Sequence, residues 1–434
     1  MSLAALTCAA ARTAAVLALG AGLFAAPLRA EIPQESGDLM DAIEVIRASM
    51  PLPGSEGFAP PSSLDLSRWR LVCDAFLDER PEAVDSLINL FFPSYEIVTF
   101  IDQGLDNREY RLLRETIPPT LAWGTYVRAV DHQRLIAIEV PHGRYETNTP
   151  SEGIDVFRRT GALLFEMNGA HRCANSAFTP CDGTSDVCGT GRYHVSDMGH
   201  TTQTAFQAMH EEYTKAHPGG YSFSMHGMSQ TDCSDIFLSN GTATGSTQML
   251  RDMKDSMNES GDIVVCVAGD GTCGCTLSGT TNVQGRYTNG SPQPCYLPAS
   301  GNNGRFIHAE QLRRVRDNYA IYSKFIAAIN GAIDTVTSIG GHIPPDVALY
   351  LSVPRPNPAG SVMQFSLFSR YDQDVTVALY DIFGAKVGTL YRGAVWRGAG
   401  LDLKLRPEQF SSGVYFIRAT GISASANRKV ILVR

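Results

Sequence analysis

Two different patterns of apolar and polar positions divide this chain. As far as about residue 340, short apolar runs such as LIAIEV, YSFSM and RFIHA alternate with segments whose apolar residues have helical spacing. Beyond residue 360 only short strand-like runs remain, at intervals of about 8–12 residues with turn residues between them. The first pattern predicts an α/β fold with a central mixed sheet flanked by helices, and the second predicts an all-β sandwich.

Individual elements follow from the same spacing. Helices are predicted over residues 80–92, 150–160 and 201–216, with a longer helical pattern that ends at Ile329. Strands are predicted at YEIVTFID, LIAIEV, GALLFEM, YSFSM and RFIHA. The C-terminal sandwich, for which we expect an immunoglobulin-like arrangement, is predicted from six runs: VMQFSLFS, VTVALYD, KVGTLYRG, LDLKL, GVYFIRAT and RKVILVR.

These patterns divide the chain into five segments. Residues 1–30 contain an apolar run, TAAVLALGAGLFAA, preceded by an arginine, which is typical of a secretory signal peptide. Residues 31–64 are polar and proline-rich and are predicted to be an N-terminal extension. The α/β domain is predicted over 65–340, a proline-rich linker over 341–360 and the sandwich over 361–434. We expect no transmembrane segment in the mature chain, because no later apolar run is long enough.

The composition limits the partners and the compartment. A net charge of −8 without a basic run argues against nucleic acid as a partner. Eight of the ten cysteines lie within residues 173–295, as expected for local disulfides in an exported protein. These eight would form four bridges, with the pairing left open, in loops predicted at 173–199 and 239–304. Zinc ligation by Cys273 and Cys275 is the alternative, but one C-x-C without a second pair is not a usual zinc spacing.

Three titratable residues are expected at the carboxyl ends of predicted strands. His142 follows LIAIEV by one proline, His226 follows YSFSM directly, and Glu310 closes RFIHAE. Open α/β sheets bind their ligands just outside the carboxyl ends of the strands. The pattern therefore favours a site that is shared by these three strand ends.

Two acidic residues follow His142, and helix chemistry distinguishes them. Thr149 and Glu152 fit a capping box with proline at the start of a helix, which would give Glu152 a local role. Glu146 remains, and a His-x-x-x-Glu turn with His226 would supply two imidazoles and one carboxylate, a usual catalytic zinc set. The alternative is that the histidine is only a hydrogen-bonded turn residue and that the glutamate is solvated.

Further polar residues near these strand ends are candidates for substrate binding. Arginine holds a substrate carboxylate through paired hydrogen bonds. His210 has helical spacing with apolar residues and is expected to pack rather than to bind a ligand. The residues predicted to bind substrate are Arg172, His200, Arg286 and Arg316.

Five stretches together carry a resemblance: IEVPHGRYETNT, GAHRC, SDMGHTT, SMHGM and GRFIHAEQLRRVR. Over about residues 120–330, the chain resembles N-formylglutamate amidohydrolases and poly-γ-glutamate hydrolases of the zinc carboxypeptidase-like group. The resemblance implies that zinc is held by His142, Glu146 and His226, that Glu310 is a proton shuttle, and that arginines such as Arg286 and Arg316 hold a substrate carboxylate. The turn departs from the group's pattern because Arg144 and Tyr145 replace small residues.

A second resemblance covers the C-terminal ninety residues, at PRPNPAG, VALYDIFGAKV, SSGVYFIRAT and the final RKVILVR. These stretches resemble the sorting domain of proteins exported by type IX secretion. The resemblance implies that the type IX secretion machinery is a partner and that the protein is secreted or held at the cell surface. A carbohydrate-binding or adhesive sandwich is the alternative.

Together these observations predict an exported zinc-dependent amidohydrolase or carboxypeptidase-like enzyme that cleaves an amide bond of an acidic small-molecule or peptide substrate. The alternative is a non-catalytic binding protein that is displayed at the surface on an amidase-like fold. A metal with a purely structural role is a third hypothesis.

Overall fold

The computed structural model describes residues 32–433, except for 106, 231–232, 244, 272–273, 334–347, 352–353, 355–356, 358, 397–400 and 423. The predicted signal peptide, and most of the predicted linker, lie outside the described residues. Among the helices that are described, none is both long enough and apolar enough to cross a membrane.

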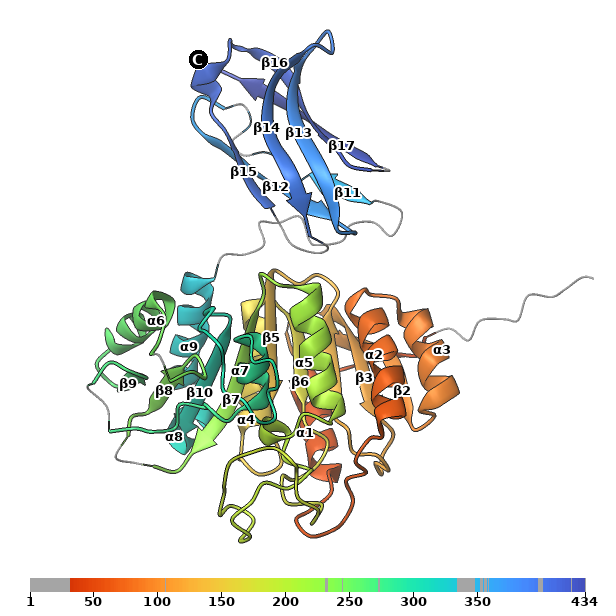
Figure 1. Ribbon diagram of the computed structural model, residues 1–434, viewed down its shortest axis with the longest axis vertical. Coiled ribbons are helices and arrows are strands. Elements are labelled where there is room, and N and C mark those ends of the chain that lie inside the picture. Colours follow the sequence, from red (N-terminus) through yellow and green to blue (C-terminus); the bar gives the residue numbers. More distant parts are fainter. Residues whose placement is uncertain are drawn as a thin grey trace, which may run out of the picture. The chain divides into compact units, whose positions relative to one another are not determined.

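A ten-stranded mixed sheet forms the centre of the first domain, in the order β1-β2-β3-β4-β6-β5-β7-β10-β8-β9 (Figure 1). Four consecutive strands, β6, β5, β7 and β10, are parallel to one another, whereas other pairs, such as β2 with β3 and β10 with β8, are antiparallel. The predicted mixed sheet is therefore confirmed. The strands are β1 (Gln34–Gly37), β2 (Tyr95–Asp102), β3 (Arg108–Glu115), β4 (Thr125–Ala129), β5 (Arg134–Val140), β6 (Ala162–Met167), β7 (Tyr221–Met228), β8 (Ile236–Ser239), β9 (Val265–Val267) and β10 (Phe306–Leu312).

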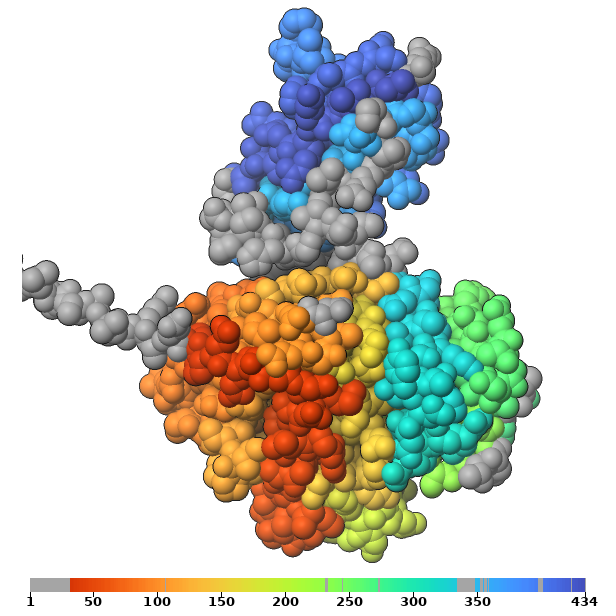
Figure 2. All heavy atoms as spheres, turned by 180° about the vertical axis from the view of Figure 1, so that it is seen from behind, coloured from red at the N-terminus to blue at the C-terminus, as the bar shows by residue number. Residues whose placement is uncertain are grey.

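Helices cover both faces of this sheet, as predicted. One face carries α1 (Leu39–Ser49), α4 (Thr149–Thr160), α6 (Gln248–Asn258) and α9 (Tyr319–Ala332), and Figure 2 shows α1 and α9 on it. The other face carries α2 (Ser63–Leu77), α3 (Pro81–Phe91), α5 (Ala205–Ala216) and α7 (Val283–Thr288) (Figure 1). The short helices η1 (Met198–His200) and α8 (Arg313–Arg316) lie in the connections.

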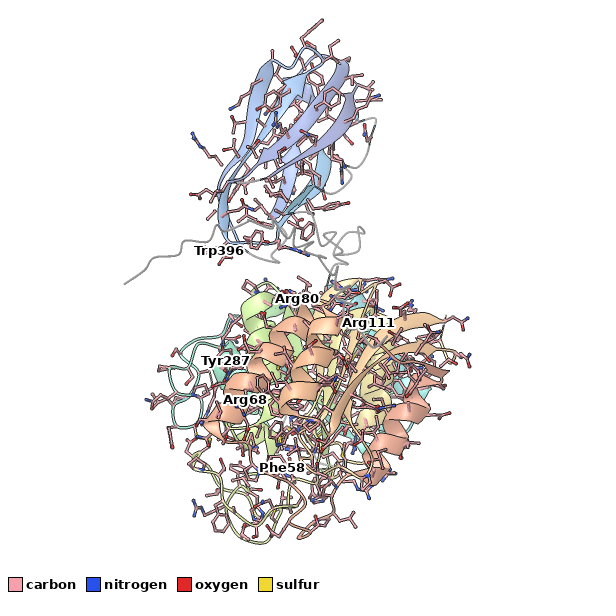
Figure 3. The ribbon with its side chains drawn as sticks, turned by 90° about the vertical axis from the view of Figure 1, so that its right-hand side faces the viewer. Phe58, Arg68, Arg80, Arg111, Tyr287 and Trp396 are labelled. Atoms are coloured by element: carbon pink, nitrogen blue, oxygen red, sulfur yellow. A yellow bond between two sulfur atoms is a disulfide. The ribbon has the colours of Figure 1, made fainter. Side chains whose placement is uncertain are left out.

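Each face has its own hydrophobic core, because alternate residues of every strand point to opposite faces. Ile136, Ile138 and Val140 of β5 belong to the core under α1, α4 and α9. Trp69 anchors the opposite layer, with its ring centroid 4.8 Å from that of Tyr95. Figure 3 shows this layer from the side, with Arg68 and Arg80 labelled on its outer helices.

Residues 31–64, predicted to be an extension, contribute to this domain. β1 pairs in parallel with β2, and α1 buries Leu39, Ile43 and Ile46 in the core. The spacing of these three residues along one helix face gives α1 an apolar stripe, which packs against α4. The sheet therefore begins at Gln34 and not after residue 64.

The segment 239–304, predicted as a loop, also contains regular structure. Helix α6 buries Leu250, Met253 and Met257, spaced three and four residues apart, and β9 adds the last strand of the sheet. The segment 239–304 is rich in Gly, Ser and Thr, and this composition led to a loop prediction that included the short amphipathic helix α6. The loop prediction was wrong for this part.

Disulfides pin the long connections of the α/β domain, as predicted. The bridges are Cys173–Cys188, Cys181–Cys295 and Cys233–Cys275, and Cys266 is also disulfide-bonded. Because Cys275 is bonded to Cys233, zinc ligation by Cys273 and Cys275 is excluded as a pair. Cys273 lies outside the described residues, and Cys73 is a buried free thiol.

The C-terminal domain consists of two antiparallel sheets that share one hydrophobic core. All six predicted strands are present, and one more, β11 (Leu349–Leu351), lies inside the predicted linker. β11 pairs with β12, so the domain begins before residue 361. An immunoglobulin-like arrangement remains a prediction. The strands are β12 (Met363–Ser369), β13 (Gln373–Asp381), β14 (Lys386–Val395), β15 (Leu401–Leu405), β16 (Gly413–Thr420) and β17 (Ser425–Leu432), with the short helix η2 (Pro407–Gln409).

Candidate metal centre

The three predicted residues His142, His226 and Glu310 belong to neighbouring parallel strands or their ends. His142 lies two residues beyond the end of β5. β7 and β10 extend further than predicted, so His226 and Glu310 lie inside strands and are direct partners in the parallel register. The long connection between β6 and α5 lies at the same end of the sheet (Figure 1).

A tight turn brings His142 and Glu146 together. The backbone N–H groups of Tyr145 and Glu146 both donate to the carbonyl of His142, at 2.8 Å. Asn168 accepts a 2.7 Å hydrogen bond from the N–H of Gly143 and holds the turn against the end of β6. One helical turn places residues four apart on the same side, so both side chains face the same point.

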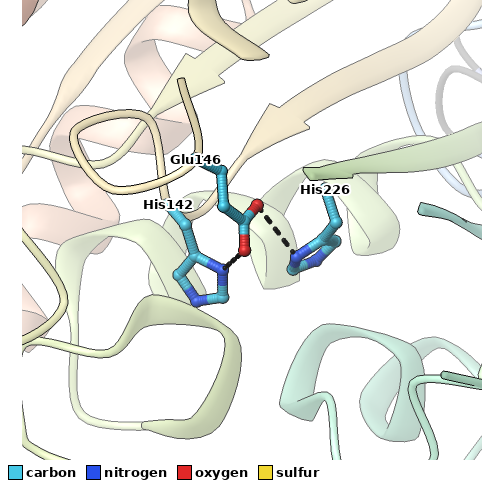
Figure 4. Close-up of side chains that lie close together, drawn as sticks. All are labelled: His142, Glu146 and His226. Atoms are coloured by element: carbon cyan, nitrogen blue, oxygen red, sulfur yellow. Dashed lines mark hydrogen bonds and ion pairs between the residues drawn. The ribbon is translucent and has the colours of Figure 1, made fainter. Parts of the chain in front are cut away.

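The carboxylate of Glu146 lies between the two imidazoles (Figure 4). Nδ1 of His142 is 2.8 Å from Oε1, and Nδ1 of His226 is 3.4 Å from Oε2. The N–H of Gly227 also donates to Oε2, at 2.9 Å. All three side chains are buried, and their ligand-type atoms lie within 4.8 Å of one another.

The outer nitrogen of each imidazole is held by another side chain. Nε2 of His142 is 2.9 Å from Oδ1 of Asp197, and Nε2 of His226 is 3.0 Å from Oγ of Ser224. Ligating histidines commonly have their second nitrogen fixed in this way. His142 thus faces carboxylates at both nitrogens, whereas a neutral imidazole has only one N–H. His142 therefore requires either a second ring proton or a metal ion in place of one proton, and the side chains fit a cation.

The electrostatics agree with a site that attracts cations. Burial would raise the pKa of Glu146, but the charges of His142 and His226 hold it well below its ordinary range. Burial also opposes ionisation of Asp197, yet Arg172 and His142 lower its pKa below the ordinary value. Both carboxylates are therefore ionised.

Glu152 does not take part, but not for the predicted reason. No capping box is present: the N-cap is Asn148, and the Thr149 hydroxyl donates to the carbonyl of Glu146. The Glu152 side chain is buried and accepts a 2.9 Å bond from Nε2 of Gln311. Burial raises its pKa to about 8. Glu152 therefore makes a tertiary contact with Gln311 of β10 in place of the predicted local contact with the start of α4.

Glu310 lies beside the three candidate ligands. Burial, and then the charge of Glu146, raise its pKa to about 8. Oε1 of Glu310 is 3.8 Å from Nε2 of His308, whose ring centroid is 4.4 Å from that of His226. Burial and the neighbouring His226 keep the pKa of His308 well below its usual range.

The four predicted substrate-binding residues have different surroundings. Arg172 is buried, and its Nε and Nη2 donate hydrogen bonds to Oδ2 of Asp197, at 2.8 and 2.5 Å. The guanidinium of Arg316 packs against the Cα of Gly227 and donates to the carbonyl of Thr147. Both arginines therefore lie at the site.

Arg286 and His200 complete this set. All three guanidinium nitrogens of Arg286 donate to Asp182 or to the carbonyls of Thr280 and Pro294, and the Cys181–Cys295 bridge joins the loops that contain Asp182 and Pro294. Arg286 therefore braces two loops in this structure, and its role as a substrate ligand stays a prediction. Nδ1 of His200 donates to the carbonyl of Thr281 at 3.2 Å, which leaves Nε2 as an acceptor. Burial lowers the pKa of His200 to about 3, so its ring is neutral.

Sequence reasoning assigned no role to Asp197, Ser224 or His308. The last two could have been found from strand alternation: Ser224 is two residues from His226, and His308 is two residues from Glu310, so each pair shares a face. Asp197 comes from a disulfide-pinned loop 55 residues away from His142 along the chain, and no local pattern indicates that contact.

Comparisons with known proteins bear on the C-terminal domain. Residues 355–433 match the family described as a secretion system C-terminal sorting domain. A solved structure of dimeric latent PorU from Porphyromonas gingivalis matches at 20% identity, over 20% of this chain and 9% of that one, with a TM-score of 0.17. That likeness is too low to support an argument. A search of curated proteins finds no match.

The sorting domain determines the destination of the protein. It indicates export, to a secreted or cell-surface location, and implies interaction with the type IX secretion machinery. The comparisons give no support to the hydrolase resemblance. Any proposal for the function of the α/β domain therefore depends on its side-chain geometry.

Proposed function

We propose that the α/β domain is a zinc-dependent hydrolase, exported by type IX secretion, that cleaves an amide bond of a carboxylate-bearing substrate. One observation carries this proposal: Nδ1 of His142 and Nδ1 of His226 face opposite oxygens of Glu146, while Asp197 and Ser224 hold the outer nitrogens. Two imidazoles and one carboxylate with fixed outer nitrogens are a usual catalytic zinc set.

A zinc ion at this position would polarise a carbonyl and lower the pKa of a bound water to about 7. The residues of the chain supply the remaining steps. Glu310, adjacent to His226 on the next strand, is assigned to proton transfer: the charge of a bound cation would favour its ionised form, and its carboxylate would then accept a proton from water and return it to the departing amide nitrogen. His308 lies beside Glu310, with its Nε2 3.8 Å from Oε1, and as a neutral ring it adds no charge next to the carboxyl group.

Arg316 is the residue that best suits a substrate carboxylate. Its guanidinium lies against Gly227, one residue from His226, and its Nε has no partner among the described residues. Arg172 has a positioning role instead, because its paired bonds keep Asp197 ionised and aligned with His142. Arg144 and Tyr145 lie within the turn, between His142 and Glu146, and the exposed ring of Tyr145 can contact a substrate.

Metal content and amide hydrolysis test the proposal together. His226→Ala should remove one equivalent of zinc per chain, measured by mass spectrometry of the purified mature protein, and abolish amine release from N-acyl glutamates. The matched control is His217→Ala, which changes a histidine beyond the far end of β7 and should alter neither quantity. Full zinc content in folded His226→Ala would contradict the ligand assignment. Folded wild-type protein without metal or amidase activity would favour the binding-protein hypothesis.

A further inference from the structure

A second group of potential metal ligands lies inside the α/β domain, apart from the centre described above. Glu139 on β5 and Glu166 on β6 are partners in the parallel register, so their carboxylates lie side by side. Nδ1 of His210, from α5, is 2.6 Å from Oε1 of Glu139. All three side chains are 0% exposed, and one ligand atom from each lies within 4.8 Å of the others.

Three of the four carboxylate oxygens in this group lack a hydrogen-bond donor. Oε2 of Glu139 and both oxygens of Glu166 are buried and have no partner among the described residues. Burial, and then the like charge of Glu139 beside it, raise the pKa of Glu166 well above its usual range. Two adjacent buried carboxylates cannot both be ionised without a compensating positive charge.

His210 is oriented as a ligand would be. Its Nε2 is 2.9 Å from Oγ1 of Thr288, which fixes the ring and leaves Nδ1 facing the carboxylates. His142 has the same arrangement, with Nδ1 toward a glutamate and Nε2 held by an oxygen. His210 was predicted to pack rather than to bind a ligand, and its buried ring does lie edge-on to that of Tyr287, which is labelled in Figure 3. Packing alone does not account for the two carboxylates.

We propose that Glu139, Glu166 and His210 bind a divalent transition-metal cation, of the zinc or manganese class, in the interior of the domain. The charge of the cation balances the two carboxylates, and its coordination supplies partners for the oxygens that lack them. Carboxylate and imidazole ligands together suit these metals. The cation links β5, β6 and α5, and its role is structural because all three ligands are inaccessible to solvent.

This interior site is next to the proposed catalytic centre. Ser224 is the partner of Glu139 in the register between β5 and β7, and its hydroxyl holds Nε2 of His226. Side chains of in-register parallel partners point to the same face. The two sites therefore share one face of the sheet but no ligand, so each can be removed without the other.

Metal analysis of variants separates the two sites. In a His142→Ala/His226→Ala background, which lacks the first site, we expect one equivalent of zinc or manganese per chain by mass spectrometry. Adding Glu166→Gln to this background should reduce the metal content to below a tenth of an equivalent per chain. Adding Glu152→Gln instead, which changes another buried glutamate with an unpartnered oxygen, should leave it unchanged. A folded His142→Ala/His226→Ala protein without metal overturns the proposal and indicates that the pair is held by protons.

Cobalt binding provides a measurement that does not depend on the folding of Glu166→Gln. Co²⁺ added to metal-depleted His142→Ala/His226→Ala protein should give ligand-field absorption that saturates at one equivalent. No absorption would overturn the proposal. Failure of the proposed catalytic site would look different: the wild-type protein would then bind a single equivalent, and Glu166→Gln would remove it while His226→Ala would not.

Discussion

Replacing Glu152 by glutamine should remove a pH dependence of stability that arises from one buried carboxyl group. Glu152 is 1% exposed, and its Oε2 accepts from Nε2 of Gln311. Its Oε1 and Oε1 of Gln311 both lack partners among the described residues. A proton on Glu152 supplies the donor that this pair lacks, and the amide of glutamine supplies the same donor permanently.

The expected magnitude follows from the pKa of Glu152, which burial raises from 4.5 to about 8. Between these values the folded chain keeps a proton that the unfolded chain has released. Stability therefore falls as the pH rises from about 4.5 and becomes constant above about pH 8. The difference between these two pKa values corresponds to at most about 5 kcal/mol in the free energy of unfolding at 25 °C. As the pH rises from 4.5 to 9, the stability of Glu152→Gln relative to wild type should therefore increase by up to this amount.

Guanidinium unfolding followed by tryptophan fluorescence can measure this difference. The exposed Trp396 belongs to the C-terminal domain, so a Trp396→Phe background leaves Trp69 and Trp123 as reporters of the α/β domain. Glu82→Gln, at an exposed position on α3, is the control and should change stability equally at every pH. A stability difference between Glu152→Gln and its parent that stays constant from pH 5 to 9 would refute the reasoning.

Two further substitutions test the candidate metal centre. Asp197→Asn should weaken zinc binding by about 10–100-fold, measured by competition with a chelator, because it weakens the partner that orients His142; unchanged affinity would mean that Asp197 serves only Arg172. Gly227→Ala would place a methyl carbon 2.5 Å from Cζ of Arg316 and should lower stability by about 1–3 kcal/mol. In an Arg316→Ala background the same change should cost less, and an equal cost in both backgrounds would show that this contact is not the cause.

Local periodicity was sufficient to predict most elements of this chain. Alternating and helical spacings depend only on which face of an element is buried, so β5, α4, β7 and all six predicted C-terminal strands could be located. The spacing of apolar residues did not predict β1, which is only four residues long, or α6, which lies in a segment rich in Gly, Ser and Thr. The candidate ligands His142, Glu146 and His226 were also identifiable, because strand ends and tight turns are local features.

Only the tertiary structure decided which side chains meet. Asp197 reaches His142 from a loop, Gln311 reaches Glu152 from another strand, and the register of β5 and β6 places Glu139 beside Glu166. Strand order and register depend on contacts between segments far apart in the sequence, and the periodicity of one segment contains no information about its partner. The sequence thus determined the elements and one set of candidate ligands, whereas the fold decided the outer partners of that set and brought together the second, interior group of candidate ligands.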